Sequence, residues 1–338
     1  MKILEQTFDD FKSLIKEYYK KDRFLAASAY REIFKNGNLN FRSVKDMNRN
    51  PDFMKSLTAD LRLNIGDIEQ KNSEEDVLKF VTKLSDGLKI ESVIIPMFTH
   101  NTLCISSQVG CRMGCKFCET GKDGLKRNLS VEEITAQIYN ARITLGYDIR
   151  NIVYMGMGEP LDNFKNVIKS LEIISDPRGF DIPLTKVTLS TSGRVDGINK
   201  LSEQKWAEKI NLAVSLNASN DSIRSKLMPV NDKYSMGKLI EELNKFPLRT
   251  KGSIFVEYVL IKDVNDSIDD ARRLVEYLKP IKNQINLIPY NPGKDSLYRT
   301  PDERTVEQFR KVLIDSEVFV RRRATRGRMA MAACGQLS

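Results

Sequence analysis

The chain has 338 residues, enough for one large or two modest domains around a buried core. Hydrophobic residues make up 41% and charged residues 29%, as in ordinary soluble globular proteins, while a net charge of +9 and a pI of about 9.1 favour a polyanionic partner, nucleic acid first. No stretch approaches the ~18 consecutive apolar residues of a membrane-spanning helix, and the first residues lack the apolar core of a signal peptide, so we expect a cytoplasmic protein.

Residues 1–88 are polar and show helical periodicity. Apolar residues recur three and four positions apart between residues 3 and 18, and a second predicted helix covers residues 22–35 and ends at Gly37. A third predicted helix covers residues 41–57, with an interruption near Pro51. Lysines and arginines punctuate all three helices, which fits either solvated helix faces or an accessory domain that grips RNA.

The pattern changes near residue 90 to apolar strands that alternate with amphipathic helices. The predicted strands cover residues 92–95, 103–107, 151–155, 186–190, 209–216, 253–261 and 284–289. The predicted helices cover residues 131–145, 164–176, 197–204, 236–246 and 267–278. Regular alternation predicts an α/β fold of parallel strands joined by right-handed crossovers, and six such units from residue 103 onward predict an open, partial (β/α)6 barrel. Chemistry in such barrels sits at the carboxyl ends of the strands.

Three of the five cysteines fall within eight residues, in Cys111-Arg-Met-Gly-Cys115-Lys-Phe-Cys118. Clustered cysteines in a chain that is not secreted indicate metal binding or catalysis. A structural zinc site normally has four protein ligands, whereas a 4Fe–4S cluster held by three cysteines leaves one iron open to a small molecule. The spacing therefore favours a cluster over zinc or three unrelated buried thiols. It resembles the signature of the radical SAM superfamily, in which S-adenosylmethionine (SAM) binds the open iron.

Glycine-rich or polar segments follow the later strands of the predicted barrel. They are Gly156-Met-Gly158-Glu159, Ser190-Thr-Ser-Gly193, Ser215-Leu216-Asn217 and Pro289-Tyr-Asn291. Each alone is typical of a simple strand-to-helix connection, but together they recur at successive strand ends. Glycines let the backbone approach a ligand closely, and Glu159 can accept hydrogen bonds from the ammonium group of SAM. Ser190 and Asn291 are candidates for binding its ribose hydroxyls or its carboxylate.

The end of the chain carries five arginines within eight residues, at positions 321, 322, 323, 326 and 328. Such a cluster is typical of a grip on a phosphate backbone, and an exposed basic tail without a partner is the alternative. Cys334 follows, and its neighbours Ala332, Ala333 and Gly335 are small enough to let the segment enter a crowded site.

Together these motifs resemble the RlmN/Cfr family of radical SAM RNA methyltransferases, nearly from end to end. The resemblance rests on Glu91-Ser-Val-Ile-Ile-Pro96, Cys104-Ile-Ser-Ser-Gln-Val-Gly-Cys111, Lys126-Arg-Asn-Leu129, Gly156-Met-Gly-Glu-Pro160, Leu189-Ser-Thr-Ser-Gly193, Met228-Pro-Val-Asn231, Ile288-Pro-Tyr-Asn291-Pro292 and Ala332-Ala-Cys334-Gly-Gln-Leu337. It implies a helical RNA-binding accessory domain at residues 1–88, a radical-SAM partial barrel at residues 89–320, and a basic tail at residues 321–338 that carries a methyl-accepting cysteine.

The resemblance also implies cofactors and roles for single residues. A 4Fe–4S cluster would bind Cys111, Cys115 and Cys118, and SAM, two molecules per turnover, would contact Gly158, Glu159, Ser190, Ser215, Leu216, Asn217 and Asn291. One SAM would methylate Cys334, and the other would yield a 5′-deoxyadenosyl radical that activates this methyl group for addition to adenine. Glu91 would remove a proton from the adduct, and Cys104 would release the product by forming a disulfide with Cys334. Outside the family context, Glu91 reads as a surface residue of an edge strand and Cys104 as a buried core thiol.

Three departures from the family pattern stand out. Asn217 replaces the usual histidine, although an asparagine still donates and accepts hydrogen bonds. Glu119 stands where a small residue is usual, and Arg328-Met-Ala-Met331 replaces an acidic segment just before the tail cysteine. This last change removes negative charge, which predicts an altered seating of the tail or an altered choice of RNA.

The leading hypothesis is methylation of carbon 2 of an adenosine in large-subunit rRNA, with tRNA as a second candidate substrate. The same family includes carbon-8 enzymes that confer antibiotic resistance, and Pro160 favours the carbon-2 branch. An iron–sulfur RNA-binding protein without methyl transfer is the alternative from another class, but it would need neither Cys104 nor Cys334. We further expect a monomer, an external electron donor such as flavodoxin, and no membrane partner.

Overall fold

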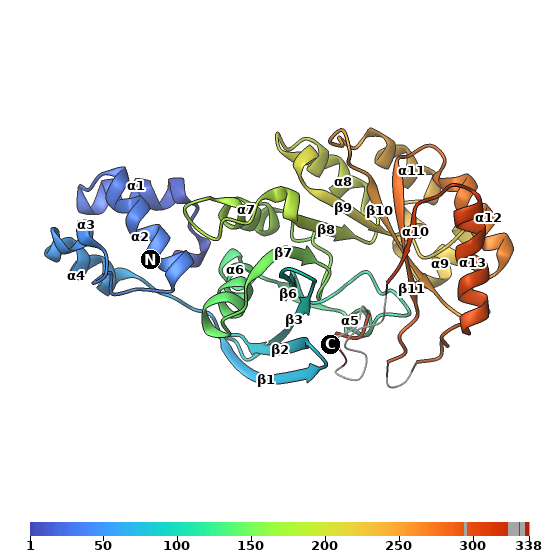
Figure 1. Ribbon diagram of the computed structural model, residues 1–338, viewed down its shortest axis with the longest axis horizontal. Coiled ribbons are helices and arrows are strands. Elements are labelled where there is room, and N and C mark those ends of the chain that lie inside the picture. The colour runs from blue at the N-terminus through green and yellow to red at the C-terminus, as the bar shows by residue number, and fades with distance from the viewer. Residues whose placement is uncertain (294–295, 324–330, 332–334, 338) are drawn as a thin grey trace.

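The computed structural model describes residues 1–293, 296–323, 331 and 335–337. Its N-terminal helices gather at one end of the molecule (Figure 1): η1 (Ile3–Glu5), α1 (Phe8–Tyr19), α2 (Arg23–Asn36), α3 (Lys45–Asn48) and α4 (Pro51–Asp60). The side chains of Thr7 and Asp22 accept backbone hydrogen bonds at the starts of α1 and α2. The left-handed Gly37 (φ 64°) ends α2, as predicted.

The prediction of a helical segment up to residue 88 is wrong for residues 67–83. β1 (Asp67–Glu74) and β2 (Val77–Lys83) form an antiparallel hairpin there. The sequence of β2, Val-Leu-Lys-Phe-Val-Thr-Lys, is rich in β-branched and aromatic residues, which favour a pleated, half-buried surface. The hairpin joins the main sheet through β3 (Lys89–Pro96). The division of the chain into domains at residues 88 and 320 stays a prediction.

Within the described residues, ten strands form one sheet in the order β1-β2-β3-β4-β7-β8-β9-β10-β11-β12. The remaining bounds are β4 (Asn101–Cys104), β7 (Ile149–Tyr154), β8 (Val187–Thr191), β9 (Asn211–Ser215), β10 (Ile254–Leu260), β11 (Asn283–Pro289) and β12 (Val320–Arg322). Pairing is antiparallel from β1 to β4 and parallel from β4 to β12. The six predicted parallel strands are therefore confirmed, and β12 extends the parallel part beyond them.

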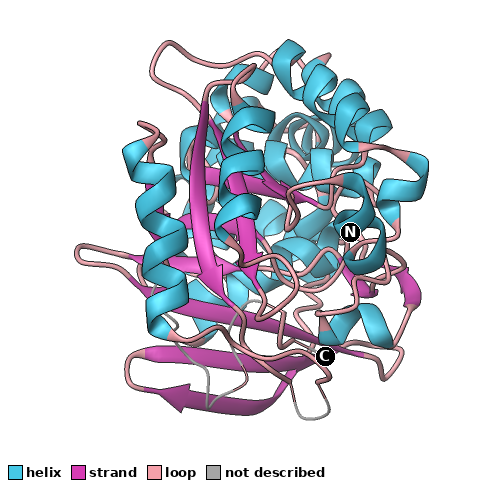
Figure 2. Cartoon of the chain, turned by 90° about the vertical axis from the view of Figure 1, so that its right-hand side faces the viewer, coloured by secondary structure: helices cyan, strands magenta, loops and turns pink. Residues whose placement is uncertain are grey.

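The sheet curves without closing. In the part of the chain that the structure describes, β1 and β12 end the sheet at opposite edges and do not pair with each other (Figure 1). Figure 2 shows helices packed beside these strands. The arrangement confirms the predicted open, partial barrel.

Helices connect the parallel strands. They are α6 (Val131–Tyr139), η2 (Asn140–Thr144), α7 (Phe164–Ser175), η3 (Leu184–Lys186), α8 (Val195–Ser202), η4 (Ala207–Lys209), α9 (Asp221–Leu227), α10 (Val230–Lys233), α11 (Met236–Lys245), α12 (Ile268–Leu278) and α13 (Glu303–Asp315). The predicted helices correspond to α6 with η2, α7, α8, α11 and α12. α13 was not predicted, although Val306, Phe309 and Leu313 are buried at helical spacing.

A small hairpin beside the main sheet holds the cysteine motif. β5 (Gln108–Gly110) pairs with β6 (Leu125–Asn128), and the segment between them contains all three clustered cysteines and α5 (Glu119–Lys122). Gly110 has φ 73°, and a Cβ atom there would lie 1.9 Å from the carbonyl oxygen of Gly124. Only glycine fits this close approach, which closes the base of the cysteine loop.

One continuous hydrophobic core joins the N-terminal helices to the sheet. The rings of Phe34 and Phe180 meet edge to face, with centroids 5.0 Å apart. The buried hydroxyl of Thr135 on α6 donates to the carbonyl oxygen of Leu4 at 2.7 Å. The N-terminal segment is thereby fixed against the side of the barrel at α6. None of the described helices combines the length and the apolar character that crossing a bilayer requires.

Candidate active site

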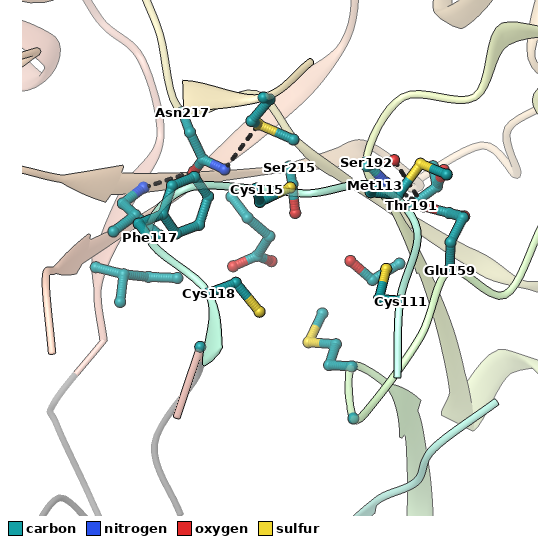
Figure 3. A pocket seen from close by; sticks show the side chains of 18 of the residues that line it. Cys111, Met113, Cys115, Phe117, Cys118, Glu159, Thr191, Ser192, Ser215 and Asn217 are labelled. Carbon is teal, nitrogen blue, oxygen red and sulfur yellow. Dashed lines mark hydrogen bonds between the residues drawn. The ribbon is translucent and has the colours of Figure 1, made fainter. Parts of the chain in front are cut away.

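A pocket lies between the cysteine loop and the carboxyl ends of the parallel strands (Figure 3). It encloses about 910 Å³ of empty space when its open mouth is included. Its lining includes the predicted site residues Cys111, Cys115, Cys118, Gly158, Glu159, Ser190, Ser215 and Asn217. Predicted residues from four separate segments thus meet in one place, as expected for chemistry at strand ends.

The other predicted site residues lie elsewhere. Leu216 and Asn291 are buried but are not among the residues that line the pocket. Glu91 and Cys104, on β3 and β4, are also buried outside this lining. Cys334 lies outside the described residues.

The cysteine loop turns back on itself so that its thiols border the same space. The backbone N–H of Cys111 donates to the carbonyl of Gly124 at 3.0 Å, and that of Cys118 donates to the carbonyl of Cys115 at 3.2 Å. The N–H of Lys116 donates to the carbonyl of Leu227 at 2.9 Å, which ties the loop to α9. The thiols are held on a fixed backbone.

The environment of these thiols disfavours a bare thiolate. Burial, helped by the nearby charges of Glu159 and Cys118, raises the pKa of Cys111 to about 12 against the lowering effect of a backbone hydrogen bond from Met113. Burial and the adjacent Cys118 and Cys111 raise the pKa of Cys115 well above its ordinary value, and burial also raises that of Cys118. Thiolates in this position need positive charge close by, which bound iron supplies.

The Gly156-Met-Gly158-Glu159 loop passes directly over the ends of neighbouring strands. A Cβ atom on Gly156 would lie 2.7 Å from the carbonyl group of Ile105, and the φ of Gly158 is 100°. The N–H of Glu159 donates to Oε1 of Gln108 at 2.9 Å. Both glycines are needed because the loop runs too close to its neighbours for a side chain.

Glu159 links this loop to the next one. Its buried carboxylate accepts hydrogen bonds from the N–H (2.7 Å) and hydroxyl (2.8 Å) of Ser192 and from the N–H of Leu161 (3.1 Å). Burial raises the pKa of this carboxyl group, and the Ser192 and Leu161 hydrogen bonds oppose the rise. Glu159 therefore orients the loops after β7 and β8. Its contact with the ammonium of SAM stays a prediction.

Asn217 adopts a left-handed conformation (φ 56°), which asparagine tolerates better than most residues. Its side-chain oxygen accepts from the N–H of Val259 at 2.8 Å, and its amide donates to the sulfur of Met228 at 3.3 Å. Its carbonyl accepts from the side chain of Asn265 at 2.8 Å. The asparagine at this departure from the family pattern thus braces the ends of β9 and β10.

Glu91 and Cys104 lie on the same face of adjacent strands. Cys104 is opposite Val93, two residues after Glu91, and alternate residues of a strand share a face. Nζ of the buried Lys79 on β2 donates to the Glu91 carboxylate at 2.9 Å and to the carbonyl of Met331 at 3.1 Å. Lys79 thus joins the predicted base to the C-terminal segment.

The described end of the tail is fastened to the cysteine loop. The N–H of Glu119 donates to the carbonyl of Gly335 at 2.8 Å, and the hydroxyl of Thr120 donates to the carbonyl of Leu337 at 2.5 Å. The side chain of Gln336 donates to the carbonyl of Pro292 at 3.2 Å. Gly335, which follows Cys334 in the sequence, lines the pocket.

The arginine cluster is not a uniform phosphate grip. Arg322 pairs with Glu303 and Glu307 of α13, and Arg323 lines the pocket 3.6 Å from the carboxylate of Glu257. Both side chains therefore have acidic partners within the protein, and the phosphate grip stays a prediction. The arginines at positions 326 and 328 lie outside the described residues.

The sequence did not single out three residues of this region, namely Lys79, Ser192 and Glu257, and Arg323 was named only as part of the arginine cluster. The sequence did contain a sign of Lys79 and Glu257, because each is a charged residue flanked on both sides by apolar residues of its strand. Ser192 was quoted only as part of a loop. Its bond to Glu159 depends on two strands that are distant in the sequence.

Comparison with known proteins decides the family. The model of the radical SAM superfamily matches residues 105–277. The chain is 41% identical to the probable dual-specificity RNA methyltransferase RlmN 1 of Protochlamydia amoebophila (strain UWE25), over 99% of this chain and 93% of that protein. A crystal structure of a radical SAM methyltransferase from Sphaerobacter thermophilus matches with a TM-score of 0.89 and 30% identity, covering 100% of this chain and 99% of that one.

The chain belongs to the RlmN family of radical SAM methyltransferases. A further relative, the dual-specificity RNA methyltransferase RlmN of Syntrophotalea carbinolica, is 44% identical over 94% of this chain and 84% of that protein. The fold and the family resemblance predicted from the motifs are both confirmed.

Membership of the radical SAM RlmN family means that the cofactors are a 4Fe–4S cluster and SAM. The donor set fits a cluster, since three thiols from one loop line the pocket. In the part of the chain that the structure describes, no three His, Cys, Asp or Glu side chains already stand at metal-binding separation. The three thiols of a 4Fe–4S cluster bind different iron atoms, so they need to border one space and do not need to meet at a single ion.

Alanine in place of Gly158 is expected to weaken SAM binding at least ~10-fold, because strained backbone of this kind costs of order 1–3 kcal/mol. A Cβ atom there would lie 2.5 Å from Cβ of Gln108, at φ 100°. Equilibrium dialysis of SAM against the cluster-loaded variant measures the effect. Gly87→Ala is the matched control, since Gly87 also has positive φ (83°) but nothing within 4 Å. Equal SAM affinity in the two variants would contradict the role of the Gly158 loop.

Proposed function

We propose that this protein is a dual-specificity RNA methyltransferase that methylates carbon 2 of an adenosine in large-subunit rRNA and in tRNA. One observation carries the proposal most strongly. The pocket is lined by the cysteine loop, by the Gly158-Glu159 loop and by Gly335, which directly follows Cys334 in the sequence. A cluster site, a SAM site and the tail cysteine would thus converge on one space. Relatives named dual-specificity RNA methyltransferase RlmN support the substrate class.

The predicted cofactor-binding residues, most of which line the pocket, divide into two sets of roles. Cys111, Cys115 and Cys118 would hold the cluster through three irons. Contacts to SAM would come from Gly158, Glu159, Ser190, Ser215, Leu216, Asn217 and Asn291. When bound, the cofactors supply the methyl group and the radical that an unreactive adenine ring carbon requires. The protein orients the ligands and keeps water out, and the buried Glu159 carboxylate fixes the two loops that do so.

Glu91, Cys104 and Cys334 act outside the cluster in this proposal. Cys334 would carry the methyl group as a thioether, the 5′-deoxyadenosyl radical from SAM would remove one hydrogen atom from it, and its carbon would then bond to carbon 2 of the adenine. Glu91 would accept the proton that carbon 2 loses, and the remaining unpaired electron would return to the cluster. The Cys104 thiolate would then attack the sulfur of Cys334, so that a disulfide forms as the carbon–sulfur bond breaks. The electron pair of that bond stays on the departing carbon, which takes up a proton to complete the methyl group. The shared face of Glu91 and Cys104, and the Lys79 bridge from Glu91 to Met331, support this assignment.

Further parts of the proposal concern partners. We place the RNA on the basic N-terminal helices and the mouth of the pocket, in line with the net charge of +9. A domain at residues 1–88 would act as the accessory RNA-binding unit. An external one-electron donor such as flavodoxin would reduce the cluster, and the protein would act as a monomer in the cytoplasm.

Replacing Cys334 by alanine is the experiment that tests the function. The variant and the wild type are reconstituted anaerobically and supplied with SAM, reductant and fragments of large-subunit rRNA or tRNA, and digested nucleosides are analysed by mass spectrometry. The wild type is expected to form 2-methyladenosine, whereas Cys334→Ala forms none while keeping its iron and its SAM binding. The reason is that alanine has no sulfur atom to carry the methyl group.

Other outcomes would reject parts of the proposal. Formation of 8-methyladenosine would move the protein to the carbon-8 branch. Full activity of Cys334→Ala would remove the methyl-cysteine route. Absence of any methylated RNA from a cluster-loaded wild type would favour an iron–sulfur RNA-binding protein.

A further inference from the structure

A row of polar side chains crosses the floor of the pocket at one level of the sheet. Glu257 of β10 is in register with Ser215 of β9 on one side and with Asn286 of β11 on the other. Ser215 and Glu257 both line the pocket, as does Arg323, which follows β12. Neighbouring strands are about 4.8 Å apart, so these groups can contact one ligand together.

Only one of the two carboxylate oxygens of Glu257 accepts a hydrogen bond within this row. Its Oε1 accepts a hydrogen bond from Nδ2 of Asn286 at 2.7 Å. Its Oε2 has no hydrogen-bond partner among the described residues, and the guanidinium of Arg323 stays 3.6 Å away. The residue is only 5% exposed.

A buried carboxylate oxygen without a hydrogen-bond donor is unfavourable, because the distant Arg323 charge does not replace the hydrogen bonds that it has lost with water. Burial raises the pKa of the Glu257 carboxyl group, and Arg323 and the Asn286 hydrogen bond oppose this rise. In its ionised form the carboxylate only accepts hydrogen bonds. The geometry of the row therefore suits a ligand that donates a hydrogen bond to Oε2.

We propose that Oε2 of Glu257 accepts a hydrogen bond from an adenosine bound in the pocket, donated by a ribose hydroxyl or by the amino group of the base. The proposal rests on the proposed function, which brings adenosine here in two forms: the adenosyl part of SAM and the target nucleotide of the RNA. Both carry the same donors. The negative charge also disfavours groups that present only acceptors, phosphates above all, at this depth of the pocket.

Glu257→Gln reverses the polarity of the contact at constant shape. The glutamine oxygen can still accept from Asn286, and its amide then presents a donor where the ligand also presents one. The expected loss is about 10- to 100-fold in affinity for the adenosine concerned, as for a hydrogen bond to a charged group. SAM affinity is measured on the cluster-loaded variant by equilibrium dialysis, and kcat/KM for the RNA fragment is measured at saturating SAM.

The two measurements identify the source of the adenosine. A weakened SAM affinity assigns Glu257 to the cofactor, and an unchanged SAM affinity with a lowered kcat/KM for RNA assigns it to the target nucleotide. Both values within about threefold of wild type overturn the proposal, since a hydrogen bond to a charged group contributes more than that. In a wild type that methylates no RNA, the proposed function fails, and the SAM measurement alone decides, with unchanged affinity overturning the role of Glu257.

Glu132→Gln is the matched control. Glu132 on α6 is likewise a buried carboxylate with an oxygen that lacks a hydrogen-bond partner among the described residues, but it is not part of the pocket lining and pairs with Lys2. It should leave both values unchanged. Thermal unfolding of each variant checks the fold. If Glu257→Gln does not fold, Glu257→Asp, which keeps the charge but withdraws the oxygen from the pocket, takes its place with the same expected losses.

Discussion

Serine in place of Cys115 is expected to abolish cluster binding and to lower RNA methylation by at least ~1,000-fold, because a hydroxyl is a poor ligand for a cluster that thiolates hold. The three thiols come from one loop and line one pocket, so no second site offers a replacement nearby. In the part of the chain that the structure describes, no group of three His, Cys, Asp or Glu side chains stands at the separation for binding a single metal ion. Iron content after anaerobic reconstitution measures the loss directly.

Lys116→Ala provides the control for this loop. Lys116 follows Cys115, and its side chain is exposed. Its backbone N–H donates to the carbonyl of Leu227, a bond that alanine keeps. This variant should bind iron as the wild type does. A Cys115→Ser protein that retains a full cluster would show that Cys115 is not a ligand.

Methionine in place of Lys79 is expected to lower the free energy of unfolding by about 3 kcal/mol, the usual cost of removing one partner of a buried ion pair. Lys79 and Glu91 are 6% and 5% exposed, and their charged atoms are 2.9 Å apart. The same substitution removes the bond to the carbonyl of Met331. Methylation should fall at least ~10-fold, because a displaced general base loses much of its effect. Urea unfolding and 2-methyladenosine formation are the two measurements.

Lys83→Met tests whether this effect is specific. Lys83 ends the same strand and pairs with Glu69, but its side chain is 46% exposed, and exposed ion pairs contribute little. Lys83→Met should change stability by less than about 1 kcal/mol and leave methylation unaltered. If both lysine variants behaved alike, Lys79 would have no special function in holding Glu91 or the tail.

The predictions that the structure confirms rest on local patterns. Alternating apolar strands and amphipathic helices from residue 90 onward located β7 to β11 and the helices between them, because strand and helix periods differ clearly in runs of this length. The three cysteines and Gly156-Met-Gly158-Glu159 were found because their spacing is short. Parallel topology then placed these segments at one edge of the sheet, where the pocket lies.

The features that the sequence did not reveal depend on contacts between distant residues. The hairpin of β1 and β2 was missed because residues 67–83 mix charged and apolar residues, and pairing of β1 with β2 and of β2 with β3 places them in the sheet. The bonds of Glu159 to Ser192 and of Glu91 to Lys79 cross between strands. The lack of a hydrogen-bond partner for Oε2 of Glu257 results from three-dimensional packing, and the spacing of residues in the sequence does not predict it.

The attachment of Gly335 and Leu337 to Glu119 and Thr120 makes the end of the chain a ligand of the cysteine loop, one residue beyond Cys118. Two binding events therefore share one segment of backbone: docking of the tail and capture of iron. Linkage requires that each strengthen the other by the same factor. During maturation of the protein, insertion of the metal and docking of the carboxyl terminus would therefore favour each other. A chain that loses one of them would hold the other less tightly.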